Sequence, residues 1–204
     1  MVRKQGFSAK QLRILQNIAE DEVEKMKGAH YWRILDTVVY LLVVIMLALS
    51  IRCLIFEPIR VEGDSMYPTL IHKEHMMVEK VSFWFKSPER GNIVICYYPG
   101  YKESCVKRVI GLPGETVAVK NGQVFVNGSA LEETDYWTDF IDDDFETITV
   151  PENHYFVMGD NRNASKDSRS ASVGCIPMEK IIGRVRGVML PLKNIRLIHG
   201  VDYS

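Results

Sequence analysis

The residue whose type and setting most suggest covalent chemistry is Ser65. It lies in the segment GDSMYPTL, residues 63–70, in which glycine, serine and proline favour a turn. A serine hydroxyl is a weak nucleophile until a neighbouring base takes its proton, and the usual base is histidine. Chemistry at Ser65 therefore depends on which base the chain supplies.

The histidines of the chain are poor candidates for that base. They are His30, His72, His75, His154 and His199. None lies in a motif typical of a hydrolase triad, and the first precedes a long apolar run. His72 and His75 could face one way as a metal pair, but no third ligand is apparent, so we interpret them as surface residues. Lysine is the alternative, because burial can lower its pKa by about 3 to 5 units and Ser-Lys dyads are a known variant of the triad.

Three segments carry a resemblance to a known family. GDSMYPTL, CVKRVIGLPGE and GDNRNASKDSR follow one N-terminal apolar run in this order, and they resemble the sequence boxes of bacterial type I signal peptidases. A fourth segment, RGNIVIC, matches less closely, since the family commonly has aspartate in place of Asn92. The short gap from Glu115 to Met158 resembles members without a large inserted second β-domain. The resemblance implies a membrane-bound serine endopeptidase that removes signal peptides from exported preproteins and needs no metal or other cofactor.

The resemblance also assigns roles to single residues. It implies that Ser65 is the nucleophile, that Lys107 is the general base and that the Ser165 hydroxyl orients the lysine amine. The residues implied to form a supporting polar cluster are Asp160, Asp167, Arg169 and Arg108. The residues implied to lie beside the oxyanion and the substrate are Gly63 and Met66.

The implied reaction is acyl transfer. Neutral Lys107 takes the proton of Ser65, the hydroxyl attacks the scissile carbonyl, and the lysinium protonates the leaving amine. Some relatives supply a second oxyanion donor from a serine two positions before the nucleophile, whereas Gly63 has no hydroxyl, so the second donor stays open. The substrate would lie extended against strand edges. Small side chains at the first and third positions before the cut, an A-x-A-like pattern, would fit two shallow apolar pockets.

These residues must be positioned by the elements around them, the first of which is an apolar run from Ile34 to Phe56. Its only charges, Asp36 and Arg52, lie near its ends. A helix over 34–55 would rise about 33 Å, enough to cross a hydrocarbon core of about 30 Å. The alternative is a buried core helix, because the charge-free centre is shorter than the usual span of about 18 residues. Both charges can snorkel to an interface, so we favour the membrane helix.

The charges before this run predict how the chain crosses the membrane. The cationic residues there are Arg3, Lys4, Lys10, Arg13, Lys25, Lys27 and Arg33. By the positive-inside rule we expect a cytoplasmic segment over 1–33 and an uncleaved transmembrane anchor over 34–56. Residues 57–204 are then one extracytoplasmic peptidase domain, held at the cell membrane by a single pass.

The exported portion is predicted to be mainly β. Short segments rich in valine, isoleucine, phenylalanine and tyrosine are bounded by glycine, proline and asparagine, namely GNIVICYY, SCVKRVIG, ETVAVKNGQVFVNG and HYFVMGD. Asn121-Gly122 between alternating runs predicts a hairpin with a type I′ turn. We expect a small antiparallel β-sandwich or barrel-like domain after the transmembrane helix, which is also the fold that the resemblance implies, with an exposed apolar surface resting on the membrane.

Two segments have no assigned chemistry. Residues 8–28 have apolar positions at helical spacing, which fits either an amphipathic helix on the inner leaflet or a partner, or a marginal solvated helix. The acidic stretch over 131–146 has no basic residue and does not match an EF-hand loop. We expect it to be a solvated, variable surface excursion.

Charge and cysteine content exclude other classes of protein. A net charge of −1 and a pI near 6.5 supply no broad cationic field, so nucleic acid is not an expected partner. The four cysteines, Cys53, Cys96, Cys105 and Cys175, form no CxxC pair. Cys96 and Cys105 flank a predicted hairpin turn and could form a disulfide or remain free buried thiols.

Three other functions would use parts of the same sequence pattern. A Ser-Lys peptidase dedicated to one client, such as a pilin, would use the same residues. A non-catalytic, membrane-tethered β-domain would not need both Ser65 and Lys107. A self-cleaving repressor would need a DNA-binding segment, which we do not find.

Overall fold

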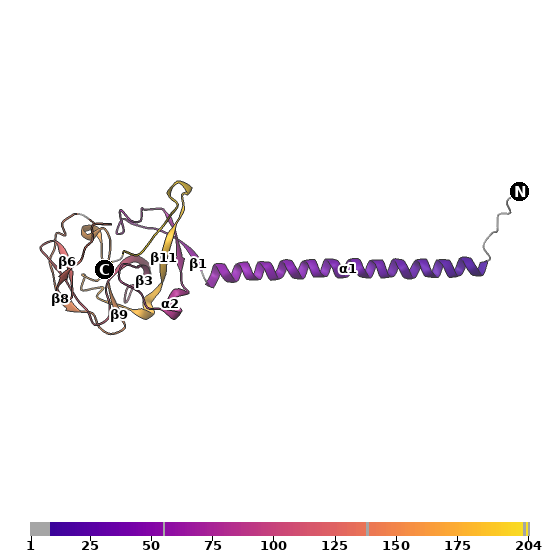
Figure 1. Ribbon diagram of the computed structural model, residues 1–204, viewed down its shortest axis with the longest axis horizontal. Coiled ribbons are helices and arrows are strands. Elements are labelled where there is room, and N and C mark those ends of the chain that lie inside the picture. Colours follow the sequence, from indigo (N-terminus) through magenta and orange to yellow (C-terminus); the bar gives the residue numbers. More distant parts are fainter. Residues whose placement is uncertain (1–8, 55, 138, 202, 204) are drawn as a thin grey trace. The chain divides into compact units, whose positions relative to one another are not determined.

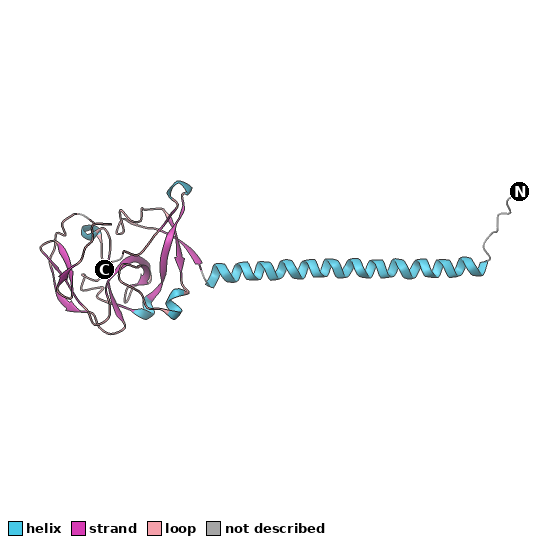
Figure 2. Cartoon of the chain, viewed as in Figure 1, coloured by secondary structure: helices cyan, strands magenta, loops and turns pink. Residues whose placement is uncertain are grey.

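The fold is taken from a computed structural model, which describes residues 9–54, 56–137, 139–201 and 203. The chain divides into two compact units, residues 1–50 and 51–204. Figures 1 and 2 show one long helix and one β-rich unit.

The helix α1 (Ala9–Leu54) is continuous for 46 residues. The two segments predicted separately, the N-terminal segment and the anchor, therefore share one helix. No proline interrupts this sequence, and a single glycine such as Gly28 costs a helix only about 1 kcal/mol. Within α1, residues Gln16–Ser50 include a stretch that is long and apolar enough to cross a membrane.

The second unit is built from two antiparallel sheets, which confirms the mainly β prediction. The larger sheet has the strand order β1 (Phe56–Arg60), β2 (His75–Glu79), β11 (Ile181–Leu190), β3 (Ile93–Tyr97), β4 (Ser104–Gly111), β9 (His154–Met158) and β10 (Ile176–Pro177), with β12 (Arg196–Leu197) paired to β11. The smaller sheet has the order β7 (Ser129–Ala130), β6 (Gln123–Val126), β5 (Thr116–Lys120) and β8 (Phe145–Thr149). Short helices complete the unit: α2 (Ser82–Phe85), η1 (Arg162–Ala164), η2 (Met178–Lys180) and η3 (Leu192–Asn194). Register shifts interrupt the pairing of β11 with β2 and β3 and of β4 with β9, and such bulges increase the twist of a sheet.

The predicted hairpin at Asn121-Gly122 is confirmed. Both residues have positive φ, 50° and 76°, and Lys120 pairs with Gln123 across the turn. This hairpin joins β5 to β6 within the smaller sheet.

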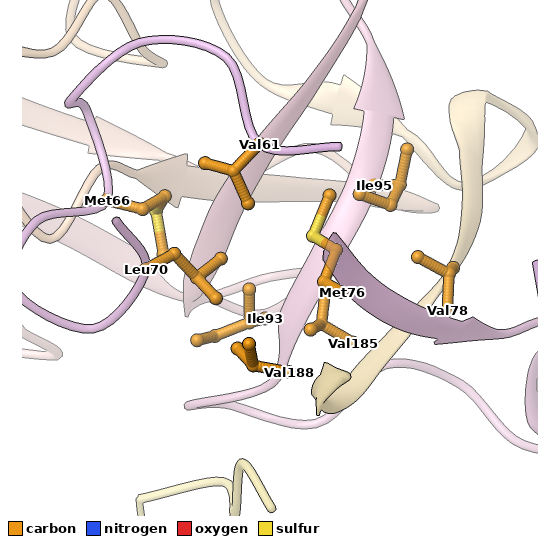
Figure 3. Close-up of a cluster of buried hydrophobic side chains, with 9 residues drawn as sticks. All are labelled: Val61, Met66, Leu70, Met76, Val78, Ile93, Ile95, Val185 and Val188. Atoms are coloured by element: carbon orange, nitrogen blue, oxygen red, sulfur yellow. The ribbon is translucent and has the colours of Figure 1, made fainter. Parts of the chain in front are cut away.

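A buried apolar cluster fixes the segment that carries the candidate nucleophile. Val61, Met66 and Leu70 from this segment pack with residues of β2, β3 and β11, as Figure 3 shows. Met66 and Leu70 are almost fully buried, and Leu70 N–H donates to the Met66 carbonyl at 2.9 Å. The backbone on the C-terminal side of Ser65 is therefore held against the core.

The acidic stretch is not a solvated excursion throughout. Glu133, Tyr136 and Ile141 are buried, and the end of the stretch enters strand β8. The prediction is wrong for Glu133 because its carboxylate is paired with an arginine from a distant segment. A charge that would be costly to bury alone is tolerated when it is paired and hydrogen-bonded.

Candidate active site

Ser65 and Lys107 meet at the centre of the candidate site. Lys107 Nζ lies 2.8 Å from Ser65 Oγ, although the two residues are 42 positions apart in the chain. Ser65 is half-buried in the loop between β1 and β2, and Lys107 projects from β4. At this distance a lysinium donates to the hydroxyl oxygen, whereas a neutral amine accepts the hydroxyl proton.

The setting of Lys107 favours the neutral amine. Only 3% of the residue is exposed, and its amine also lies 2.9 Å from the carbonyl oxygen of Val106. Burial lowers the pKa of the Lys107 ammonium below its usual value of 10.5, while the thiol of Cys105 and the carboxylate of Asp167 oppose that change. The net shift means that more of the amine is neutral at a given pH than for an exposed lysine, and only the neutral amine can act as a base.

Gly159 brings the segment of Ser165 against that of Ser65. A Cβ at position 159 would collide with Ser165 Oγ and with the Ser65 carbonyl oxygen. Any larger residue at position 159 would therefore push the two serine segments apart.

The hydroxyl of Ser165 forms no hydrogen bond within the described part of the chain. Its Oγ is inaccessible to solvent and has no hydrogen-bond partner among the described residues. The bond to the Lys107 amine that the resemblance implies for Ser165 is not formed, and the amine is instead bonded to Ser65 and Val106. A buried hydroxyl without a partner beside the reacting groups leaves one donor and one acceptor unused.

The predicted supporting residues form two ion pairs. Asp160 accepts from Arg108 Nε at 2.7 Å and from Nη2 at 2.6 Å, and both side chains are almost fully buried. Asp167 accepts from Arg169 Nε and Nη2, each at 2.9 Å. Each carboxylate thus has its own guanidinium, and neither depends on Lys107 for a counterion.

The pair of Asp160 and Arg108 joins segments that are far apart in sequence. The Thr69 hydroxyl, in the nucleophile segment, donates to Asp160 at 2.5 Å. Gly159 N–H donates to Asp167 at 3.0 Å. The segment 159–169 is therefore tied both to the nucleophile segment and to β4.

Asn161 is a positioning residue that sequence reasoning missed. Its backbone N–H donates to the Ser65 carbonyl at 3.1 Å, and its side-chain Nδ2 donates to the Asp64 carbonyl at 3.2 Å. It thereby holds the backbone on both sides of the nucleophile. The only sequence signal was its place in the segment GDNRNASKDSR.

A second missed group lies deeper, around Glu133. Its carboxylate accepts from Arg162 Nη1 at 2.7 Å and from Nη2 at 2.5 Å, and from the Tyr136 hydroxyl at 2.6 Å. The Arg108 guanidinium lies 3.9 Å from the centroid of the Tyr136 ring, which is within cation–π range. The acidic stretch is therefore connected to the ion pair of Asp160.

A cleft of about 570 Å³ opens beside the two reacting groups. Ser65 and Lys107 line it, with Gly63 and Met66 on the nucleophile segment. Its apolar lining includes Ile59, Met76, Ile95 and Val106. A nucleophile, a buried amine and an apolar cleft together are suited to attack on an extended peptide.

The position of Gly63 bears on the second oxyanion donor. Its φ is +84°, a conformation that favours glycine, and its N–H donates to His72 Nδ1 at 3.0 Å. In this structure that N–H is engaged, so it is not a free oxyanion donor. Among the described residues no group of three or more metal-ligating side chains comes together. The Nδ1 atom of His72 accepts the hydrogen bond from Gly63 N–H.

Comparisons with known proteins point to one family. The family model described as signal peptidase, peptidase S26, matches residues 34–190. Signal peptidase I S of Bacillus subtilis is 39% identical over 173 residues, which cover 80% of this chain and 92% of that protein. A signal peptidase I of Bacillus amyloliquefaciens is 37% identical over 184 residues, which cover 85% of this chain and 97% of the relative. A solved structure of a signal peptidase I from Enterococcus faecalis V583 is 34% identical, covers 48% of this chain and 97% of its own, and superposes with a TM-score of 0.42.

Proposed function

Since the chain belongs to the signal peptidase family, peptidase S26, we propose that it removes signal peptides from exported preproteins with Ser65 as nucleophile and Lys107 as general base. The observation that carries the proposal is the 2.8 Å distance between Lys107 Nζ and Ser65 Oγ, with the amine almost fully buried. A lysine in that setting can act where a triad would use histidine.

The proposed reaction has two stages. In acylation, the neutral Lys107 amine takes the Ser65 proton as Oγ attacks the scissile carbonyl, and the lysinium then gives that proton to the leaving amine. In deacylation, the same amine takes a proton from water as the water oxygen attacks the ester carbonyl, and the lysinium then returns that proton to Ser65 Oγ as the bond between Oγ and the acyl carbon breaks. The Ser65 N–H is the proposed first oxyanion donor, and the Gly63 N–H is not the second because it is bonded to His72.

We propose that the substrate binds as an extended strand in the cleft. Residues 59–63 and 102–106 line the cleft, and their backbone groups can pair with a peptide. β1 is at one end of the larger sheet, so its outer edge is suited to pairing with an added strand. Apolar walls from Ile59, Met76 and Ile95 support a preference for small side chains at the first and third positions before the cut.

We also propose that residues 34–56 anchor the protein in the cell membrane, with 1–33 in the cytoplasm and 57–204 outside. Inside α1 the hydroxyls of Thr37 and Ser50 donate to the carbonyls of Arg33 and Met46, each at 2.8 Å, so neither hydroxyl faces lipid unpaired. The β-rich unit exposes apolar side chains that suit contact with lipid, namely Trp84, Phe85, Leu192, Ile195 and Leu197.

The pH dependence of cleavage should report the ionisation of Lys107. Only the neutral amine accepts a proton, so kcat/KM is expected to rise with pH through the pKa of Lys107. Burial lowers that pKa, so the midpoint of the rise is expected below 10.5. Measuring kcat/KM for a preprotein across pH checks this, and a midpoint at or above 10.5 would contradict a buried lysine base.

The direct test is cleavage of a preprotein by the detergent-solubilised, full-length protein. We expect one new N-terminus directly after an A-x-A-like site, found by N-terminal sequencing of the product. Several unrelated preproteins should be processed. Cleavage of a single client would favour a dedicated Ser-Lys peptidase, and cleavage of none would reject the proposal.

A further inference from the structure

Two thiols outside the proposed mechanism lie face to face beside the candidate site. Cys96 of β3 and Cys105 of β4 are directly opposite partners in the antiparallel register. Their sulfur atoms are 3.5 Å apart, and Cys105 Sγ is 3.3 Å from the Cys96 carbonyl oxygen. Cys96 is fully buried, whereas Cys105 is partly exposed and lines the cleft.

The backbone at this pair is already suited to a covalent bond. Directly opposite residues of antiparallel strands have Cα atoms about 4.5 to 5.5 Å apart. A disulfide requires a Cα separation of about 4.4 to 6.8 Å and a sulfur separation of about 2.05 Å. The two sulfurs can therefore be joined by rotation of the side chains without a shift of the strands.

The pair also lies close to the proposed general base. Cys105 and Lys107 are two residues apart on β4, which places them on the same face of the strand, about 7 Å apart along it. Cys96 and Cys105 pack in one buried cluster with Tyr98 and Val109, and Tyr98 continues from β3 on that face. The ionisable or polar groups around the Lys107 amine are Ser65, Cys96, Cys105, Asp160 and Asp167.

We propose that Cys96 and Cys105 are a redox pair whose conversion between two thiols and an inter-strand disulfide tunes the basicity of Lys107. This inference rests on the proposed function of Lys107 as general base. The oxidant class is a low-molecular-weight disulfide, as is available outside the cytoplasm. One Cys sulfur attacks that disulfide and releases one small thiol, and the second Cys sulfur then attacks the mixed disulfide and releases the other. The two protein thiols lose two electrons and two protons, and the small disulfide gains both to become two thiols.

Cys105 is suited to make the first attack. The hydrogen bond from the Cys96 thiol lowers the pKa of Cys105, and the same contact raises the pKa of Cys96. Cys105 is also the member of the pair that borders the cleft, so a small disulfide can reach it.

Oxidation should make Lys107 easier to deprotonate. In the reduced protein, ionisation of Cys105 places a negative charge near the amine, which raises the pKa of Lys107 against the effect of burial. A disulfide carries no such charge, so the oxidised protein should keep the amine neutral at lower pH. On the acidic limb of the activity profile, a shift on the order of one pH unit corresponds to a change in kcat/KM of about tenfold.

The test uses the full-length protein carrying Cys53→Ser and Cys175→Ser, so that only the proposed pair remains. The protein is equilibrated in buffers of reduced and oxidised glutathione, alkylated, and weighed by mass spectrometry. In the oxidising buffer we expect the loss of the two thiol hydrogens and no alkylation. Two alkylated cysteines in excess oxidised glutathione would overturn the proposal.

The second readout is the pH profile of cleavage in each buffer. We expect the rise of kcat/KM with pH to have its midpoint at lower pH in the oxidised protein than in the reduced protein. In a further Cys105→Ala variant, we expect the midpoint to be the same in both buffers. Identical limbs for the oxidised and reduced pair would overturn the tuning of Lys107 even if the disulfide forms. If neither form cleaves a preprotein at any pH, the proposed function fails, and the mass measurement still decides whether the pair is redox-active.

Discussion

Replacing Lys107 by alanine is expected to lower kcat/KM for signal-peptide cleavage by about 10⁴-fold or more, because the Ser65 hydroxyl loses its only proposed base. Ser65→Ala removes the nucleophile and should cost at least as much. Since the two residues act as one unit, the double variant should be no worse than the poorer single variant. Initial rates of preprotein cleavage by the solubilised proteins provide the measurement.

Two further variants serve as controls. One tests whether Lys107 is needed for proton transfer or only for its charge, and the other tests whether loss of any lysine lowers the rate. Lys107→Arg keeps a cationic side chain, but guanidinium does not give up its proton, so the same loss is expected. Lys120→Ala removes an exposed lysine at the end of β5 and should leave the rate unchanged. Cleavage at the normal rate by either Lys107 variant would refute the assignment of the base.

Asp160→Ala is expected to lower the free energy of unfolding by about 3 to 5 kcal/mol. The reason is that the Arg108 guanidinium would stay buried without its carboxylate partner, to which it now donates two hydrogen bonds. The Thr69 hydroxyl would lose its acceptor in the same change. Chemical denaturation of the solubilised protein, followed by a probe of the β-rich unit, gives the value.

A solvent-exposed ion pair provides the matched control for Asp160→Ala. Lys80 and Glu57 lie 2.5 Å apart, but 26% and 47% of their side chains are exposed. Glu57→Ala should therefore cost less than about 1 kcal/mol. If Asp160→Ala costs no more than Glu57→Ala, the buried pair does not stabilise the fold as argued.

Local patterns were sufficient to predict several strands but not β11, an internal strand of the larger sheet. The segment over 104–111 was recognised in full because it is rich in β-branched residues, and it forms β4. The segment IIGRVRGVML, which forms β11, combines two glycines and two arginines with the apolar residues that would signal a strand. Position 183 requires glycine because a Cβ there would collide with the backbone of Glu79. Sequence alone does not reveal this contact.

Motifs identified candidate site residues, whereas their partners depended on tertiary structure. The resemblance named Asp160 and Arg108, but their 52-residue separation leaves the pairing undetermined until the sheet forms. Glu133 shows the opposite case. It lies in a charge run, which usually indicates a solvated surface, yet Arg162 of η1 forms an ion pair with it inside the fold.

Lys107 and Arg108 are neighbours on β4, so the pleat of the strand directs them to opposite faces. In the register of β4 against β3, Lys107 faces Val94. The strand thereby places the Lys107 amine, which must lose its proton to act as a base, on one face and the Arg108 guanidinium, which stays protonated, on the other. If Val106 were deleted and the pairing of the residues before it were kept, every later residue of β4 would move to the opposite face. Arg108 would then take the place of Lys107 beside the Ser65 hydroxyl. A one-residue slip of this strand would therefore damage catalysis as much as loss of the amine itself, although every residue type needed for the reaction would still be present.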